Sequence, residues 1–148
     1  MSGFMRHDSR DGFSLIEVLI ALTILAVGLL GIALLQITAV KGNAMANETA
    51  LATLYAQNRM ERFRRIPFDN IVSSPGIDGT TQQPNFAVLP TTSGIETTTT
   101  KKGVVIYRVW SVVNTSSTLK TISVWACWVD DKGKWHTARM VTQKGNLL

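Results

Sequence analysis

Residues 12–35 read GFSLIEVLIALTILAVGLLGIALL, and this stretch decides how the chain is organised. Between residues 18 and 35, Thr23 is the only polar side chain. An ordinary secretory signal has an apolar segment of about 7–15 residues that ends at a small-residue cleavage site. Here the expected cleavage site precedes the apolar segment, so the segment would remain in the mature protein.

A single carboxylate, Glu17, lies directly before the apolar run. A carboxylate within a membrane span is costly and tends to be functional where it occurs. The alternative is a glutamate at the level of the lipid headgroups that pairs with nothing.

The junction formed by Gly12, Phe13 and Glu17 resembles the processing site of type IV prepilins and of the pseudopilins of type II secretion. In that family the prepilin peptidase cuts after the glycine, and the new amino group is methylated. The resemblance implies a cleaved leader at residues 1–12, cleavage between Gly12 and Phe13, and N-methylation of Phe13. It also implies that Glu17 acts in assembly by pairing with the N-terminal amine of a neighbouring subunit. Gly12 suits the cut because it has no Cβ, so a protease can approach the backbone closely.

The charges around the apolar run predict the orientation in a membrane. Arg6 and Arg10 precede the run, and Lys41 is the only basic residue close behind it. By the positive-inside rule, the N-terminus is expected in the cytoplasm and the C-terminal part on the other side of the membrane. The resemblance implies that the membrane is the bacterial inner membrane, that this other side is the periplasm, and that the subunit is later found in the pilus or at the cell surface. A competing small-residue cleavage site at residues 44–46 lies well past the apolar end and inside a helical pattern.

Helical character continues to Pro67, which disfavours helix at the residue before it. The apolar residues recur at spacings of four, four and three, which is the period of an amphipathic helix: Ala52, Ala56, Met60 and Phe63. Leu51 and Tyr55 flank this stripe. We expect one helix from Phe13 to about residue 65, with a transmembrane and assembly half at residues 13–37 and an amphipathic half at residues 38–66.

Residues 67–102 read as a connecting region, because they contain all four prolines of the chain and several glycines. Their length allows a short strand around residues 86–89. The threonine run at residues 97–100 is interpreted as a solvated edge strand or loop, with glycosylation or adhesion as the alternative.

Residues 103–148 are expected to form an antiparallel sheet of three or more strands. Residues 104–113, 121–129 and 135–142 have strand composition, and the Asp130–Gly133 segment DDKG is a turn signal that predicts a hairpin. In the middle strand Ile122, Val124, Ala126 and Trp128 should face one way and cover the helical stripe. Cys127, the only cysteine, should be a small buried hydrophobe on the opposite face. The predicted class is therefore α+β, with the second half of the helix packed against the sheet. The resemblance to prepilins implies the same arrangement, the pilin fold.

The chain is most similar to PilV-type minor pilins, on the basis of residues 27–31, 59–67 and 124–128. The resemblance implies a structural subunit of a priming or tip complex, with other minor pilins, the major pilin, the prepilin peptidase, the inner-membrane assembly platform and the lipid bilayer as partners. The I-type pseudopilin of type II secretion shares much of this layout and stays open as an alternative.

No pattern in the sequence indicates an enzyme. The two histidines are far apart, no metal-ligand spacing is present, and no Gly-rich phosphate loop follows a strand. We therefore expect no catalytic residues, no metal and no cofactor.

The chain is basic, with a net charge of +5 and a pI of about 9.7. Four arginines gather near the end of the expected helix: Arg59, Arg62, Arg64 and Arg65. A solvated helix end or a contact to an acidic neighbouring pilin is favoured, since basic residues near a helix C-terminus also suit the helix dipole. A DNA-binding competence pilin is the second alternative, and it requires exposed cations along a groove.

Overall fold

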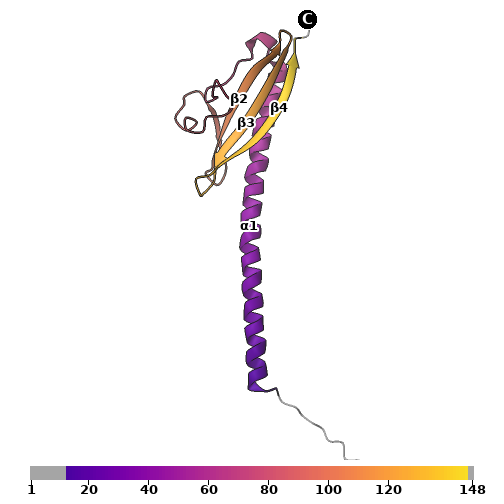
Figure 1. Ribbon diagram of the computed structural model, residues 1–148, viewed down its shortest axis with the longest axis vertical. Coiled ribbons are helices and arrows are strands. Elements are labelled where there is room, and N and C mark those ends of the chain that lie inside the picture. Colours follow the sequence, from indigo (N-terminus) through magenta and orange to yellow (C-terminus); the bar gives the residue numbers. More distant parts are fainter. Residues whose placement is uncertain (1–12, 147–148) are drawn as a thin grey trace, which may run out of the picture. The chain divides into compact units, whose positions relative to one another are not determined.

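A computed structural model describes residues 13–146. The described residues divide into two parts between Asn43 and Ala44, and residues 44–146 are called the head below. Helix α1 (Leu15–Arg65) is followed by a short 3-10 helix η1 (Phe68–Asn70). Four strands complete the described residues: β1 (Glu96–Thr99), β2 (Val105–Ser116), β3 (Leu119–Val129) and β4 (Trp135–Gly145). Figure 1 labels α1 and the three long strands.

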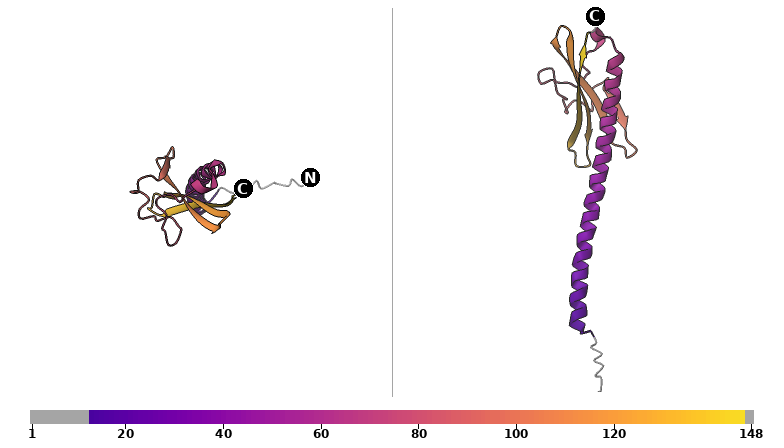
Figure 2. Two further views of the ribbon diagram at one scale, coloured as in Figure 1. Left: turned by 90° about the horizontal axis from the view of Figure 1, so that it is seen from above. Right: turned by 90° about the vertical axis from the view of Figure 1, so that its right-hand side faces the viewer.

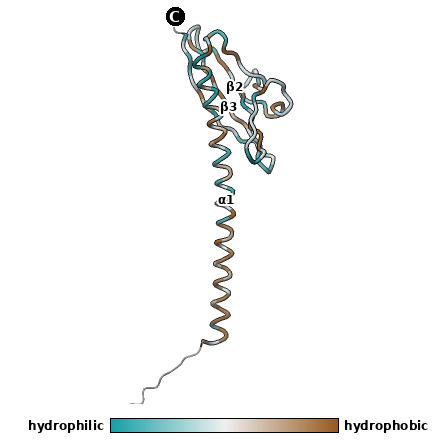
Figure 3. The backbone as a smooth tube through the Cα atoms, turned by 180° about the vertical axis from the view of Figure 1, so that it is seen from behind, coloured by the Kyte–Doolittle hydropathy of each residue, from teal (hydrophilic) through white to brown (hydrophobic). Residues whose placement is uncertain are grey.

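The first part of α1, residues 18–35, is apolar around almost its whole circumference, since Thr23 is its only polar side chain. Figure 3 colours this part of the helix as hydrophobic almost throughout. The large apolar side chains between residues 15 and 40 are exposed rather than packed against other protein atoms. A helix that is hydrophobic on all sides is suited to a membrane or to a larger helical bundle.

The head contains one antiparallel sheet, with the strand order β1-β2-β3-β4 among the described residues. Strands β2 and β3 pair from Ile106↔Trp128 to Ser116↔Leu119, and β3 and β4 pair from Leu119↔Gly145 to Val129↔Trp135. The predicted hairpin at Asp130 is confirmed. The carboxylate oxygen Oδ1 of Asp130 accepts hydrogen bonds from the backbone amides of Lys132 and Lys134, at 2.9 and 2.8 Å, and these bonds stabilise the turn.

The second part of α1 packs on one face of this sheet, as the views in Figure 2 show. The inner face contributes Ile122, Val124, Ala126 and Trp128, and the helix contributes Ala52, Ala56 and Phe63 to the same cluster. Both alanines are fully buried, and their small side chains let the helix lie close to the strands. The predicted stripe and the predicted facing of the middle strand are therefore confirmed.

The outer face of the sheet is partly covered by the segment between η1 and β1. Val109, Trp125 and Cys127 are buried there under Leu89. Gly76 allows this close packing, because its φ of +81° and its missing side chain leave room for Leu89 and other neighbours. The expectation that Cys127 is a buried hydrophobe is confirmed, and burial raises the pKa of its thiol to about 12.

The connecting region differs from the expectation at residues 86–89 and agrees with it at the threonine run. The strand expected at residues 86–89 was wrong: the amides of Val88 and Leu89 both bond to the carbonyl oxygen of Asn85, so the segment is a turn. Pro90, directly after it, has no amide hydrogen to donate to a neighbouring strand. The strand in this region is β1, which falls on the threonine run at the edge of the sheet and pairs with β2 from Glu96↔Arg108 to Thr99↔Val105. The reading of the run as an edge strand is confirmed.

Two lysines of the sheet bind the end of α1 and the short helix η1 that follows it. Lys144 of β4 donates hydrogen bonds to the carbonyl oxygens of Phe63 (2.8 Å), Arg64 (3.3 Å) and Ile66. Its neighbour across the strands, Lys120, donates to the carbonyl oxygen of Phe68 at 2.7 Å. The last carbonyl groups of a helix lack partners within the helix, so the ammonium group of Lys144 satisfies carbonyl groups at the end of α1 and favours the negative end of its dipole. Lys120 instead binds a carbonyl group of η1.

Candidate functional site

Two of the three residues singled out by the sequence, Phe13 and Glu17, lie at or just before the N-terminal end of α1. The amides of Glu17 (3.0 Å) and Val18 (3.2 Å) bond to the carbonyl oxygen of Ser14, so the first helical turn begins there. Phe13 lies just before this turn with an exposed side chain, and Glu17 lies within it. Gly12 and the rest of the expected leader are outside the described residues. A carboxylate in the first turn is favoured by the positive end of the helix dipole.

Glu17 lies near the start of an exposed apolar surface, which extends along α1 to about residue 40. Among the described residues, α1 is long and apolar enough to cross a membrane, and none of its most apolar window is buried within the protein. Exposed apolar patches of this extent mark membrane or protein contacts. Glu17 and Phe13 therefore lie at the boundary where an apolar helix begins.

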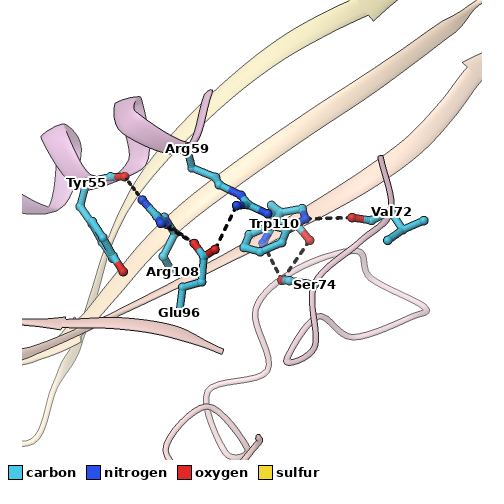
Figure 4. Close-up of polar contacts among 7 residues, drawn as sticks. All are labelled: Tyr55, Arg59, Val72, Ser74, Glu96, Arg108 and Trp110. Carbon is cyan, nitrogen blue, oxygen red and sulfur yellow. Dashed lines mark hydrogen bonds and ion pairs between the residues drawn. The ribbon is translucent and has the colours of Figure 1, made fainter. Parts of the chain in front are cut away.

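A second polar site lies inside the head, where two arginines share one carboxylate (Figure 4). Arg59 of α1 contacts Oε1 of Glu96 at 3.0 Å, and Arg108 of β2 bonds to Oε2 through Nε at 2.7 Å and also through Nη2. Nη1 of Arg108 donates to the carbonyl oxygen of Tyr55 at 2.7 Å. Glu96 is the first residue of β1, so the cluster ties this edge strand to both the helix and β2.

Aromatic rings enclose the two guanidinium groups. Arg59 lies 3.9 Å from the ring centre of Trp110 and 4.8 Å from that of Phe63, and Arg108 lies 3.8 Å from that of Tyr55. Such contacts offset part of the cost of removing the cations from water. Burial lowers the pKa of Arg59 from its ordinary value, and the Glu96 carboxylate opposes that change. The Nε of Arg59 is buried and has no hydrogen-bond partner among residues 13–146.

Trp110 extends this cluster toward the segment after η1. Its indole N–H donates to the carbonyl oxygen of Val72 at 2.8 Å. Its backbone amide donates to the hydroxyl oxygen of Ser74, also at 2.8 Å, and the amide of Ser74 returns a bond of 2.9 Å to its carbonyl oxygen. Figure 4 shows Trp110 between Arg59 and this segment. The cluster therefore holds the connecting region near both of its ends, at Ser74 and at Glu96.

The arginines at the end of α1 do not act as one group. Arg59 is largely buried in the cluster, which corrects the expectation of a solvated basic helix end at this position. Arg62, Arg64 and Arg65 remain exposed, and Arg64 approaches Glu61 at 3.5 Å in an exposed pair. The exposed basic surface of the helix end is therefore smaller than the sequence suggested.

The hairpin between β3 and β4 holds an acid and an imidazole in contact. Nε2 of His136 lies 2.8 Å from Oδ2 of Asp130, and the imidazole stacks on Trp128. The hydrogen bond from His136 and those from the turn amides lower the pKa of Asp130 to about 2. Within the described part of the chain, no group of three or more His, Cys, Asp or Glu side chains could hold a metal ion. The Asp130 carboxylate is accounted for by its role in the turn.

Sequence reasoning missed Glu96, Arg108 and Trp110 as a connected site. Glu96 is the only acidic residue between Asp78 and Asp130, and Arg108 is the only charged residue of β2, with apolar neighbours in Val109 and Trp110. A charge inside an apolar strand is the signal that could have indicated a buried ion pair. Its partner could not be read from the sequence.

The chain was also compared with known proteins. The prokaryotic N-terminal methylation motif matches residues 8–33, which include Gly12, Phe13, Glu17 and the start of the apolar helix. This motif indicates a type IV pilin-like or pseudopilin-like protein and supports anchoring in a membrane. No curated protein and no solved structure gave a significant match to the chain.

Proposed function

We propose that this pilin-like chain is a minor pilin of the type IV pilus, of the PilV type. It is stored in the inner membrane and joins other minor pilins in the priming or tip complex from which the filament grows. The observation that carries the proposal is the methylation motif at residues 8–33, which continues directly into an exposed apolar helix. The PilV-type assignment has the narrower support of the sequence resemblance at residues 27–31, 59–67 and 124–128.

The N-terminal residues have separate roles in this proposal. Cleavage between Gly12 and Phe13 creates an amine at Phe13, which is then N-methylated. Glu17 accepts the amine of an adjacent subunit. Because each charge alone is costly in an apolar bundle, the pair favours assembled subunits over isolated ones. The exposed apolar side chains of α1 are first covered by lipid and then by the helices of neighbouring subunits.

Two alternatives remain from the sequence. A minor pseudopilin of type II secretion would use the same leader, helix and carboxylate for protein export. Co-purification from membranes distinguishes the two systems, because a pilus subunit should bring down other minor pilins and the major pilin.

A DNA-binding competence pilin has the support of exposed Arg62, Arg64 and Arg65, but Arg59 is ion-paired with Glu96. A salt-dependent shift of duplex DNA by the chain in detergent would favour that role.

Processing provides the direct test of the proposal. Replacing Gly12 with leucine should block cleavage and leave the full chain in the membrane, because a bulky side chain keeps the protease from the backbone. Mass spectrometry of the wild-type chain should find N-methylated Phe13 as the first residue. Ala46→Leu is the matched control at the competing cleavage site, and it should leave processing unchanged. A mature chain that begins at Asn47 would contradict the pilin-like role.

A further inference from the structure

Strand β1 forms one edge of the sheet and borders a groove on the head. The strand pairs with β2 through only four residues, from Glu96 to Thr99. The groove has a volume of about 190 Å³ and is lined on the helix side by Leu51, Leu54 and Tyr55. Thr98, Thr99 and Thr100 line its other side, together with Ile106. The unpaired edge of β1 and the groove are therefore contiguous.

The groove lies where the sheet stops covering α1. The inner face of the sheet buries Ala52 and Ala56 completely, whereas Leu51 is 39% and Leu54 is 53% exposed. A further strand beside β1 would lie about 4.8 Å away, and its alternate side chains would point toward these two leucines. The volume of the groove suits one large apolar side chain, since a cavity of about 150 Å³ accommodates a benzene ring.

The charges around the groove have a net positive sign. Lys101 and Lys102 are exposed directly after Thr100. Beyond the other end of β1, Arg59 and Arg108 share the single carboxylate of Glu96 (Figure 4). One further acid, Glu48, lies on α1 one turn before Leu51. The two exposed lysines outnumber the single acid Glu48, and the buried group of Arg59, Arg108 and Glu96 adds one further net positive charge, so an acidic segment fits this rim better than a basic one.

A second copy of the chain does not supply such a segment from its own sheet edges. Strand β1 of another copy has the sequence ETTT and carries no large apolar side chain for the groove. Strand β4, the other edge, carries Arg139 and Lys144 and no acidic residue. A basic strand would bring these cations toward Lys101 and Lys102 beside the groove, and like charges brought close together are destabilising.

We propose that β1 and the adjoining groove bind an extended acidic segment of a different protein. The segment pairs with the edge of β1 as an additional strand and places one large apolar side chain against Leu51 and Leu54. Its acidic residues lie near the exposed side chains of Lys101 and Lys102. Strand addition of this kind takes its affinity from main-chain hydrogen bonds and its specificity from the side-chain pocket. This inference rests on the head and is independent of the proposed pilin role.

The test uses the full chain in detergent and a fluorescent peptide of about nine residues. The peptide alternates threonine and valine around a central phenylalanine, with a glutamate two positions to either side. Fluorescence anisotropy should give saturable binding that weakens as salt is raised. N-methylation of alternate peptide amides should abolish binding, because the main-chain donors to β1 are removed. A peptide with lysine in place of glutamate should bind about tenfold more weakly.

A pair of protein variants locates the binding. Leu54→Ser should weaken binding about tenfold. Val141→Ser is the matched control, because Val141 is equally exposed, at 52%, but lies on β4. The urea midpoint of tryptophan fluorescence checks that both variants are folded. If Leu54→Ser lowers that midpoint, the test is the N-methylated peptide on the wild-type chain, and binding of that peptide as tight as that of the unmethylated one would overturn the proposal. Absence of saturable peptide binding overturns the proposal, as does equal weakening by the two variants. Concentration-dependent dimers that Leu54→Ser disrupts, without peptide binding, would assign the groove to a second copy instead.

Discussion

The cluster around Glu96 predicts a large and specific effect of Glu96→Gln on the stability of the head. The side chains of Arg108 and Arg59 are only 7% and 12% exposed, and that of Glu96 is 28% exposed. Removing one partner of a buried ion pair costs about 3–5 kcal/mol, because the other charge is left uncompensated. Glutamine retains one acceptor oxygen, and water reaches this position, so we expect a loss of about 2–3 kcal/mol.

Urea unfolding of the full chain in detergent micelles measures this loss. All four tryptophans of the sequence lie in β2, β3 and β4, so their fluorescence reports on the head. With a denaturant slope of about 1–2 kcal/mol/M, the urea midpoint should fall by about 1–3 M. Glu61→Gln is the matched control, because Glu61 pairs with Arg64 in a contact that is exposed on both sides. An exposed pair of this kind contributes about 0.5 kcal/mol or less.

A double variant tests the cause of the loss. If the uncompensated guanidinium charge is responsible, Arg59→Met should be much less destabilising in the Glu96→Gln background than in the wild-type chain. Equal midpoints for Glu96→Gln and Glu61→Gln would refute the reasoning, since Glu96 would then contribute no more than a surface carboxylate.

Three further predictions follow from other parts of the chain. Gly76→Ala should lower stability by about 2–4 kcal/mol in the same urea assay, because a Cβ would lie 2.8 Å from the side chain of Ile95 and φ is positive. Gly103→Ala, where φ is +84° but no atom lies within 4 Å, should cost only about 1–2 kcal/mol, and equal losses would rule out the packing explanation. The pKa of Asp130 is lowered to about 2, so its contribution should be complete above the ordinary value of 3.8 and disappear as pH falls toward 2. Acid titration of stability should therefore be shallower in Asp130→Asn over that range, and an unchanged profile would count against the contact. Glu17→Ala should insert and be processed normally but assemble poorly, as measured by pilus number and co-purified minor pilins; wild-type values would show that the carboxylate is dispensable.

The sequence predicted much of the fold because the relevant patterns are local. The stripe through Ala52, Ala56 and Phe63 is visible as a helical period, and Pro67 marks the end of the helix. Alternation along β3 assigned its two faces, and the turn residues at Asp130 predicted the hairpin with β4. Each of these signals lies within a few residues of the element it specifies, so neither distant partners nor packing had to be known. The same locality explains why the motif at residues 8–33 could be recognised without a structure.

The tertiary structure decided which distant residues meet. Arg59 and Glu96 are 37 residues apart, and Arg108 reaches Tyr55 across 53 residues. Lys144 satisfies the end of α1 from a position 81 residues beyond Phe63. The sequence allowed a strand at residues 86–89 and either an edge strand or a loop at residues 97–100, and only pairing with β2 selected Glu96–Thr99 as the strand. Ion pairs, helix-capping lysines and edge-strand pairing depend on the path of the backbone between their members, and a periodic or local pattern contains no record of that path.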